Sequence, residues 1–202
     1  MRKKRRSSII QAAYSVFSNH GFEQATMQDI ANEASLGIAT LFRYFPRKEQ
    51  LIVAVAAGII EAYSEVLFNV VRGEGTCYEK MERLFDILTL SYQTGYQQNS
   101  RLIEAFECYV ALSKEPVEDI EIYQTQYQKI ISLLTELSML GQQDGSVRAD
   151  SNTVNYLITM MNAYGIFSKK AGMLSGIPAF HTKVDLIEQS HILKKIFLES
   201  IR

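Results

Sequence analysis

Apolar residues recur at spacings of three and four along most of the chain, which is the period of an amphipathic helix. Near the start, Ile9, Ala13 and Phe17 form such a stripe, and Gly21 follows where a left-handed helix end is expected. Pro46 limits the last helix of this region, because the residue before a proline avoids helical angles. The pattern predicts three short helices, at about 7–19, 27–34 and 38–45.

Longer helices are expected beyond Pro46. Glycines, prolines and polar clusters break the pattern in five places, and no convincing alternation with period two appears between them. We therefore expect an all-α fold, with further helices at about 47–71, 77–97, 101–113, 117–142, 152–172 and 183–200.

The charge is distributed unevenly. The whole chain of 202 residues has a formal net charge of −1, with 47% hydrophobic and 21% charged residues, as in globular proteins. Residues 1–50 carry eight Lys and Arg against four Asp and Glu, a balance of +4, which leaves −5 for the remainder. A basic segment followed by a larger acidic one predicts that one end of the chain meets a polyanion.

Other compositional features predict a cytoplasmic protein. The longest apolar run, Leu51 to Ile60, is far shorter than the roughly 20 residues of a membrane span, so no transmembrane helix is expected. Polar residues interrupt any apolar core after the basic N-terminus, which argues against a secretory leader. Cys77 and Cys108 lack metal-ligand spacing, and we expect both to be buried thiols in a reducing compartment.

The helices predicted at 27–34 and 38–45 have the lengths and tight turn of a helix-turn-helix, whose second helix enters the DNA major groove. Thr26 followed by Asp29 predicts a capping box at the start of the first of them. Ser35 stands in the turn, where a left-handed residue would cost of order 1 kcal/mol more than glycine.

The faces of the second helix support this interpretation. Leu41 and Phe45 share one face, which would pack with Leu36 and Ile30 against the helix at 7–19. The opposite face and its edges are predicted to lie along the groove, with an arginine fork suited to guanine O6 and N7 and small residues at the tip. These residues are Gly37, Ile38, Ala39, Thr40, Phe42, Arg43 and Tyr44.

The stretch TMQDIANEASLGIATLFRYFPRKEQL at 26–51, with IIQAAYSVFSNHGF before it, resembles the DNA-binding domain of the TetR family of bacterial transcriptional regulators. The resemblance covers about the first 55 residues. It implies that Thr26 and Lys48 contact phosphates and that Gln28 reaches a base or phosphate. Phe42 departs from the tyrosine usual at its position, which removes a hydroxyl contact to phosphate. The segment Arg2 to Arg6 is either a solvated tail or a phosphate-contacting arm; cations before a helix oppose its dipole, which favours the arm.

The resemblance also implies two domains, a helix-turn-helix DNA-binding domain at 1–46 and a larger helical effector-binding and dimerisation domain at 47–202. An aromatic or lipophilic small molecule is the expected effector, although core packing is the commoner role for any one aromatic residue. The aromatic residues placed in the corresponding helices are Tyr63, Phe85, Tyr92, Tyr96, Phe106, Tyr109, Tyr123 and Tyr127.

The last two helices carry broad apolar stripes that are expected to pair with those of a second subunit, the alternative being purely intrachain core. The stripes consist of Leu157, Met160, Met161, Tyr164 and Phe167, and of Leu186, Ile187, Ile192, Ile196 and Phe197.

Enzymatic function is not expected. The three histidines are scattered, and Glu104 with Glu107 has no obvious partner for paired-carboxylate chemistry. No metal or cofactor is predicted. The sequence favours a homodimeric repressor that binds a palindromic operator and is released by a small-molecule effector. The alternative is a DNA-binding structural or nucleoid-organising protein without an effector.

Overall fold

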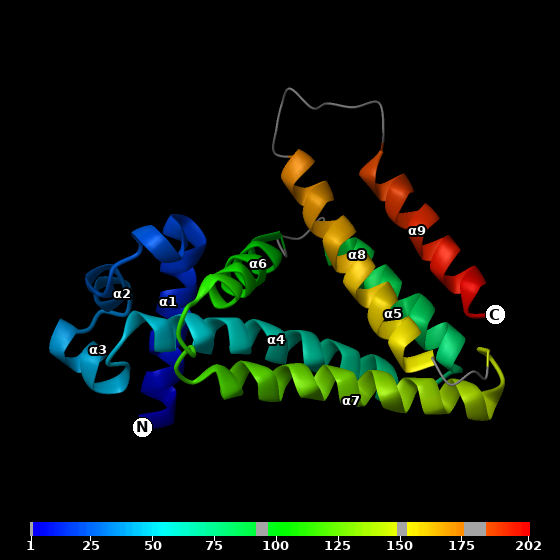
Figure 1. Ribbon diagram of the computed structural model, residues 1–202, viewed down its shortest axis with the longest axis horizontal. Coiled ribbons are helices and arrows are strands. Elements are labelled where there is room, and N and C mark those ends of the chain that lie inside the picture. The colour runs from blue at the N-terminus through cyan, green and yellow to red at the C-terminus, as the bar shows by residue number, and fades with distance from the viewer. Residues whose placement is uncertain (1, 92–96, 149–152, 176–184) are drawn as a thin grey trace. The chain divides into compact units, whose positions relative to one another are not determined.

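The computed structural model describes residues 2–91, 97–148, 153–175 and 185–202, and every regular element in these ranges is a helix (Figure 1). The all-α prediction is confirmed. The helices are α1 (Arg2–Gln24), α2 (Met27–Glu33), α3 (Ile38–Tyr44), α4 (Lys48–Arg72), α5 (Cys77–Ser91), α6 (Gln97–Leu112), α7 (Ile120–Asp144), α8 (Thr153–Ser175) and α9 (Leu186–Ser200).

The chain forms two compact units. The first unit consists of Met1–Ala62 and Arg101–Tyr127, and the second of Tyr63–Ser100 and Gln128–Arg202. The segment 1–46, predicted to bind DNA, lies entirely within the first unit. That unit also takes in the first part of α4, most of α6 and the start of α7.

The apolar stripe of α1 forms the centre of the first unit. Ile9, Ala13 and Phe17 are almost fully buried, together with Ile30 of α2 and Leu41 of α3. The ring of Phe17 meets that of Phe22 edge to face at 5.0 Å, beyond a kink in α1. Gly21 makes this kink: its φ of 73° is positive, as expected there, but its ψ of 171° is extended and not that of a left-handed helix cap.

The first helix is longer than the sequence pattern predicted. It begins at Arg2, not near residue 7, so the basic segment Arg2 to Arg6 forms helical turns. Arginine and lysine are good helix formers, and this preference outweighs the unfavourable placement of cations at a helix N-terminus. The cations therefore project from an ordered helix, at fixed angular positions around its axis.

Helix α4 contributes a continuous run of buried residues to the hydrophobic core. Of the helices in the described ranges, it is the one whose length and composition would allow it to cross a membrane, and 61% of its apolar window is buried. Every residue from Leu51 to Ala57 is buried. This burial is typical of the core helix of a folded domain.

The second unit is organised around Phe85 of α5, which is fully buried. Its ring lies 5.2 Å from that of Tyr164 on α8 and 5.8 Å from that of Phe197 on α9. Helix α7 packs closely on the start of α5: a Cβ on Gly141 would lie 2.9 Å from Cys77 Sγ and would collide with Val147. Glycine is therefore needed for this approach.

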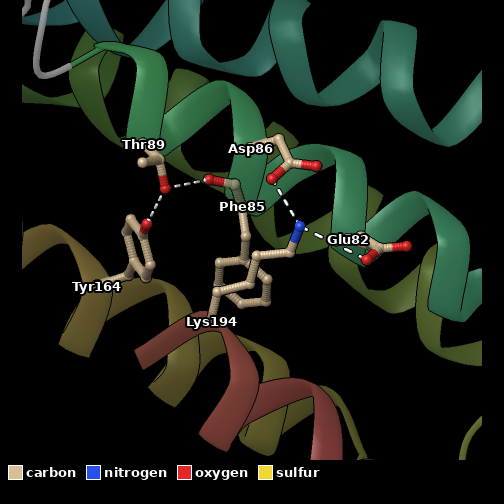
Figure 2. A network of polar contacts seen from close by, with 6 residues as sticks. All are labelled: Glu82, Phe85, Asp86, Thr89, Tyr164 and Lys194. Carbon is tan, nitrogen blue, oxygen red and sulfur yellow. Dashed lines mark hydrogen bonds and ion pairs between the residues drawn. The ribbon is translucent and has the colours of Figure 1, made fainter. Parts of the chain in front are cut away.

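Polar contacts also connect the helices of the second unit (Figure 2). Lys194 of α9 forms ion pairs with Asp86 at 2.6 Å and Glu82 at 3.5 Å, both on α5. The hydroxyl of Thr89 donates to the Phe85 carbonyl and shares a hydrogen bond with the hydroxyl of Tyr164. Helices α5, α8 and α9 are thus joined by polar as well as apolar contacts.

The two cysteines differ in environment. Cys77 is buried, as predicted, and burial raises the pKa of its thiol to about 11. Cys108 is exposed, so the prediction for this residue was wrong. Leu102 and Phe106 define the buried face of α6 at a spacing of four, and Cys108 is two residues beyond Phe106, on the opposite side of the helix.

Candidate nucleic-acid interface

Helix α2 begins with the capping box predicted from Thr26 and Asp29. The Asp29 N–H donates to Thr26 Oγ1 at 3.1 Å, and the Thr26 N–H donates to Asp29 Oδ2 at 3.0 Å. The Thr26 hydroxyl also donates to Asp29 Oδ2 at 2.6 Å. These bonds from the Thr26 hydroxyl and backbone lower the pKa of the exposed Asp29 carboxyl, which keeps it ionised at neutral pH. The box fixes where α2 starts.

A Schellman motif connects α2 to the turn before α3. The Leu36 N–H donates to the Ala31 carbonyl at 2.8 Å, and the Ser35 N–H donates to the Asn32 carbonyl at 3.0 Å. Ser35 has φ 53°, a left-handed conformation that glycine adopts at lower steric cost than serine. The motif reverses the chain within a few residues and sets the angle at which α3 leaves α2.

Helix α3 has one buried and one open face. Leu41 is fully buried and Phe45 is 2% exposed, as the sequence pattern predicted. Gly37 is the N-cap without a side-chain hydrogen bond, and a Cβ there would meet nothing within 4 Å. The fold itself therefore leaves the tip of α3 open, which suits close approach of another surface.

The structure brings all the residues predicted to contact DNA into the first unit, on or beside α2 and α3. Gln28 Nε2 donates to Asn32 Oδ1 at 2.9 Å along the outer face of α2. The exposed members of the set are Thr26, Gln28, Gly37, Ala39, Phe42 and Arg43, and the half-buried members are Ile38, Thr40, Tyr44 and Lys48.

A basic cleft lies between the start of α1 and the end of α3. Its volume is about 810 Å³, and its lining consists of Arg2, Lys4, Arg5, Ser8, Arg43 and Tyr44. Arg6 anchors this side of α1, because its guanidinium stacks over the Phe45 ring at 4.8 Å. The cations of the N-terminal segment are thus held next to Arg43 and Tyr44 at the end of α3. Ser8 of this lining was not among the residues predicted from the sequence.

Lys48 makes contacts that the sequence pattern did not predict. Its ammonium donates to the carbonyl oxygens of Phe22, Ala25 and Glu23, at 2.7, 3.0 and 3.3 Å. These carbonyls lie at the end of α1 and in the link to α2. The first turn of α4 is thereby attached to the start of the helix-turn-helix.

Two more contacts fix the beginning of α4. Arg47 pairs with Glu118, in the segment between α6 and α7, at 3.3 Å. The Tyr109 hydroxyl of α6 donates to Glu49 Oε1 at 2.8 Å. Burial and this carboxylate raise the pKa of Tyr109 to about 12, so the phenol stays protonated and remains a donor at neutral pH.

Residues 9–55 match the family model described as bacterial regulatory proteins, tetR family. This match covers α2, the Schellman turn, α3 and the first turns of α4. The helix-turn-helix of this chain is therefore of the TetR type. The N-terminal resemblance inferred from the sequence is confirmed.

Curated TetR-family relatives are named as transcriptional repressors. KstR of Mycolicibacterium smegmatis is 26% identical over 104 residues, which is 52% of this chain and 51% of KstR. KstR2 of the same organism is 22% identical over 150 residues, which is 72% of this chain and 69% of KstR2. The chain thus spans about half the length of the first of these relatives. These similar proteins are regulators and not enzymes, in agreement with the expectation from the sequence.

The fold is similar to that of a solved transcriptional regulator over almost the whole chain. The transcriptional regulator FadR from Bacillus subtilis, solved in complex with stearoyl-CoA, has a TM-score of 0.72 at 16% identity. The similarity covers 97% of this chain and 99% of FadR. The arrangement of a helix-turn-helix domain followed by a larger helical part is therefore confirmed.

The aromatic residues predicted to line an effector pocket fall into both compact units. In the first unit, the rings of Phe106 and Tyr123 lie 4.6 Å apart, and Tyr127 stacks on Tyr123 at 6.3 Å. The hydroxyl of Tyr123 donates to Glu107 at 3.3 Å, and burial followed by this carboxylate raises the pKa of Tyr123. Tyr109, whose hydroxyl binds Glu49, belongs to the same unit.

The remaining predicted pocket residues have other placements. Phe85 is a core residue of the second unit, packed on Tyr164, and Tyr63 is half-buried in that unit. Tyr92 and Tyr96 lie outside the described residues. Within the described ranges, no group of three or more His, Cys, Asp or Glu is arranged to hold a metal ion.

Proposed function

We propose that this chain is a transcriptional repressor that binds a two-fold symmetric operator as a homodimer and leaves it when a small-molecule effector binds. The observation that carries the proposal is the open face of α3, held by a buried Leu41 and Phe45 and bordered by the basic cleft. An exposed recognition helix can contact base edges while the cations beside it contact phosphates. One surface then provides both kinds of contact. A repressor must meet its operator on the chromosome, so the proposal includes a cytoplasmic location.

The proposed groove residues follow from exposure and chemistry. Arg43 is exposed at the basic cleft and offers the bidentate donor that suits guanine. Thr26 and Gln28 flank the groove at the start of α2, and the arm from Arg2 to Arg6 supplies cations for phosphates. The remaining residues along the groove are Gly37, Ile38, Ala39, Thr40, Phe42 and Tyr44.

The proposed dimer uses α8 and α9. Their apolar residues have separate roles: Leu157, Met160 and Tyr164 are buried in the core of the second unit. On α9, exposed fractions of 42%, 53% and 54% leave three isoleucines in solvent, namely Ile187, Ile192 and Ile196. Ile192 and Ile196 are four residues apart and share one side of α9, whereas Ile187 is on the other side of the helix, so the proposed subunit contact is centred on Ile192 and Ile196. A dimer also doubles the number of bases read.

The proposed division of labour is DNA binding by residues 1–46 and effector binding and dimerisation by residues 47–202. Because the structural neighbour FadR was solved with stearoyl-CoA, we propose a lipophilic effector, with a long-chain acyl-CoA as the first to test. The cluster of Phe106, Tyr123 and Tyr127 offers aromatic surface for such a molecule.

Selection of duplex DNA from a random-sequence library tests the proposal. We expect a two-fold symmetric consensus, bound by a particle of about twice the 23.0 kDa chain mass in light scattering. Specific binding should exceed binding to random duplex by a factor of about 10³ or more. Binding without any consensus would contradict the proposal and favour a nucleoid-organising protein.

Effector release has its own test with stearoyl-CoA. If the acyl-CoA weakens operator binding by some factor, typically about 5- to 150-fold, the operator must weaken acyl-CoA binding by the same factor. Binding of stearoyl-CoA with no change on saturation by operator would contradict release, and no binding would contradict the acyl-CoA class.

A further inference from the structure

We propose that Lys48 is a positioning residue that clamps the two ends of the helix-turn-helix together, and that it is not a phosphate contact. The inference rests on the proposed operator binding. It replaces the role that family resemblance implied for this residue with one based on its contacts. The three carbonyls of Phe22, Glu23 and Ala25 surround its ammonium at 2.7 to 3.3 Å.

The donors of Lys48 are all in use. An ammonium has three N–H groups and no acceptor, and three carbonyl oxygens lie within hydrogen-bond distance of it. The Lys48 side chain is half-buried, and two of the three bonds are partly buried. A phosphate oxygen would have to displace one of these carbonyls. The carbonyls at the end of a helix carry partial negative charge, so they are favourable partners for a cation.

The contacts join the entry and the exit of the DNA-reading element. Ala25 directly precedes Thr26, the N-cap of α2, and is 1% exposed. Lys48 is the first residue of α4, shortly after α3 ends at Tyr44. With both ends tied by one side chain, the angle of α3 relative to α2 is fixed before DNA arrives. Direct base contacts require such placement, because their geometry tolerates only small displacements.

The fold uses the same device a second time, in the second unit. The ammonium of Lys80, a residue that is 6% exposed, donates to the Val71 carbonyl at 2.8 Å, near the end of α4. No polyanion is involved at this buried position. Lysine capping of a helix C-terminus is therefore a structural element of this protein.

Positioning and phosphate contact predict different binding behaviour. Loss of a phosphate contact weakens specific and random DNA alike, and it lowers the slope of log K against log salt by about 0.9 for each subunit. Loss of a positioning contact weakens the specific complex alone, because random DNA does not depend on exact base contacts. The salt slope then stays the same.

The test compares Lys48→Met and Lys48→Arg with wild type, on the duplex selected by the wild-type protein and on random duplex. Lys114→Met is the matched control, since Lys114 is an exposed lysine between α6 and α7, outside both the groove residues and the helices of the proposed dimer. For Lys48→Met we expect at least a tenfold loss on the selected duplex, a loss below about twofold on random duplex, and an unchanged salt slope.

Lys48→Arg keeps the charge but spreads its donors over a planar fork, which does not fit three carbonyls grouped around one nitrogen. We expect it to lose at least fivefold on the selected duplex, again without a change of slope. If Lys48→Met does not fold, Lys48→Arg still tests the inference. Near-wild-type binding by Lys48→Arg, or a slope that falls by about 0.9 per subunit in Lys48→Met, would overturn the inference.

Melting of the free proteins separates this inference from the proposed function. Without DNA, we expect Lys48→Met to melt about 3–10 °C below wild type and Lys114→Met to melt as wild type does. An unchanged melting temperature in Lys48→Met would overturn the clamp. If wild type selects no operator but Lys48→Met still melts early, the clamp stands and the proposed function fails.

Discussion

The hydroxyl of Tyr109 on α6 donates a hydrogen bond of 2.8 Å to the carboxylate of Glu49 in the first turn of α4. Both residues belong to the first compact unit, which also contains the helix-turn-helix. The bond therefore attaches α6 to the segment that directly follows the recognition helix. It gives a measurable coupling between these two parts of the unit.

A double-mutant cycle with Tyr109→Phe and Glu49→Ala measures this coupling. We expect a coupling free energy of about 1 kcal/mol in urea unfolding, since the bond has one charged partner but is only partly buried. Additive losses in the two single variants would show that the contact contributes nothing to stability.

The pH dependence of this contribution has a definite sign. The pKa of Tyr109 rises from 10.0 to about 12 on folding, chiefly through burial and then through the bond to Glu49. A raised pKa gives stability that is fully present below the unfolded value and is lost as the pH rises through the folded value. The loss should therefore begin near pH 10 in wild type and be weaker in Tyr109→Phe.

Ser35→Gly is expected to stabilise the protein by about 0.5–1 kcal/mol, because Ser35 has φ 53° and glycine adopts this conformation without steric cost. Urea unfolding measures the change. Ser35→Ala is the control: it retains the Cβ and should gain nothing. Equal stability of the Gly and Ala variants would mean that the turn stores no strain at this residue.

Thiol labelling should distinguish the two cysteines. We expect Ellman's reagent to modify Cys108 rapidly in the native protein, since it is exposed, and to modify Cys77 only on unfolding. Burial and a thiol pKa of about 11 both protect Cys77. In Cys108→Ser the rapid reaction should disappear; a rapid reaction that persists would contradict the burial of Cys77.

Local sequence signals predicted the helix-turn-helix well. The capping box of Thr26 and Asp29, the positive φ of Gly21 and the buried pair of Leu41 and Phe45 each depend on residues close together in the chain. Propensity, capping and periodicity act at this range, so a single sequence carries their pattern.

The contacts that join distant segments were not predicted. Lys48 meets the carbonyls of Phe22 and Ala25 only once α1 and α4 are packed, and backbone carbonyls leave no mark in the pattern of side chains. The exposure of Cys108 was missed for a related reason. Cysteine is commonly buried, but its place on α6 opposite Phe106 decides its environment.

Arg43→Ala tests whether α3 reads DNA sequence. Fluorescence anisotropy would measure the affinity of wild type and variant for the selected duplex and for random duplex at one salt concentration. Lys114→Ala is the control for loss of one exposed cation. We expect a loss of about 1–3 kcal/mol per half-site on the selected duplex and little loss on random duplex. Equal losses on both duplexes would contradict sequence reading by α3.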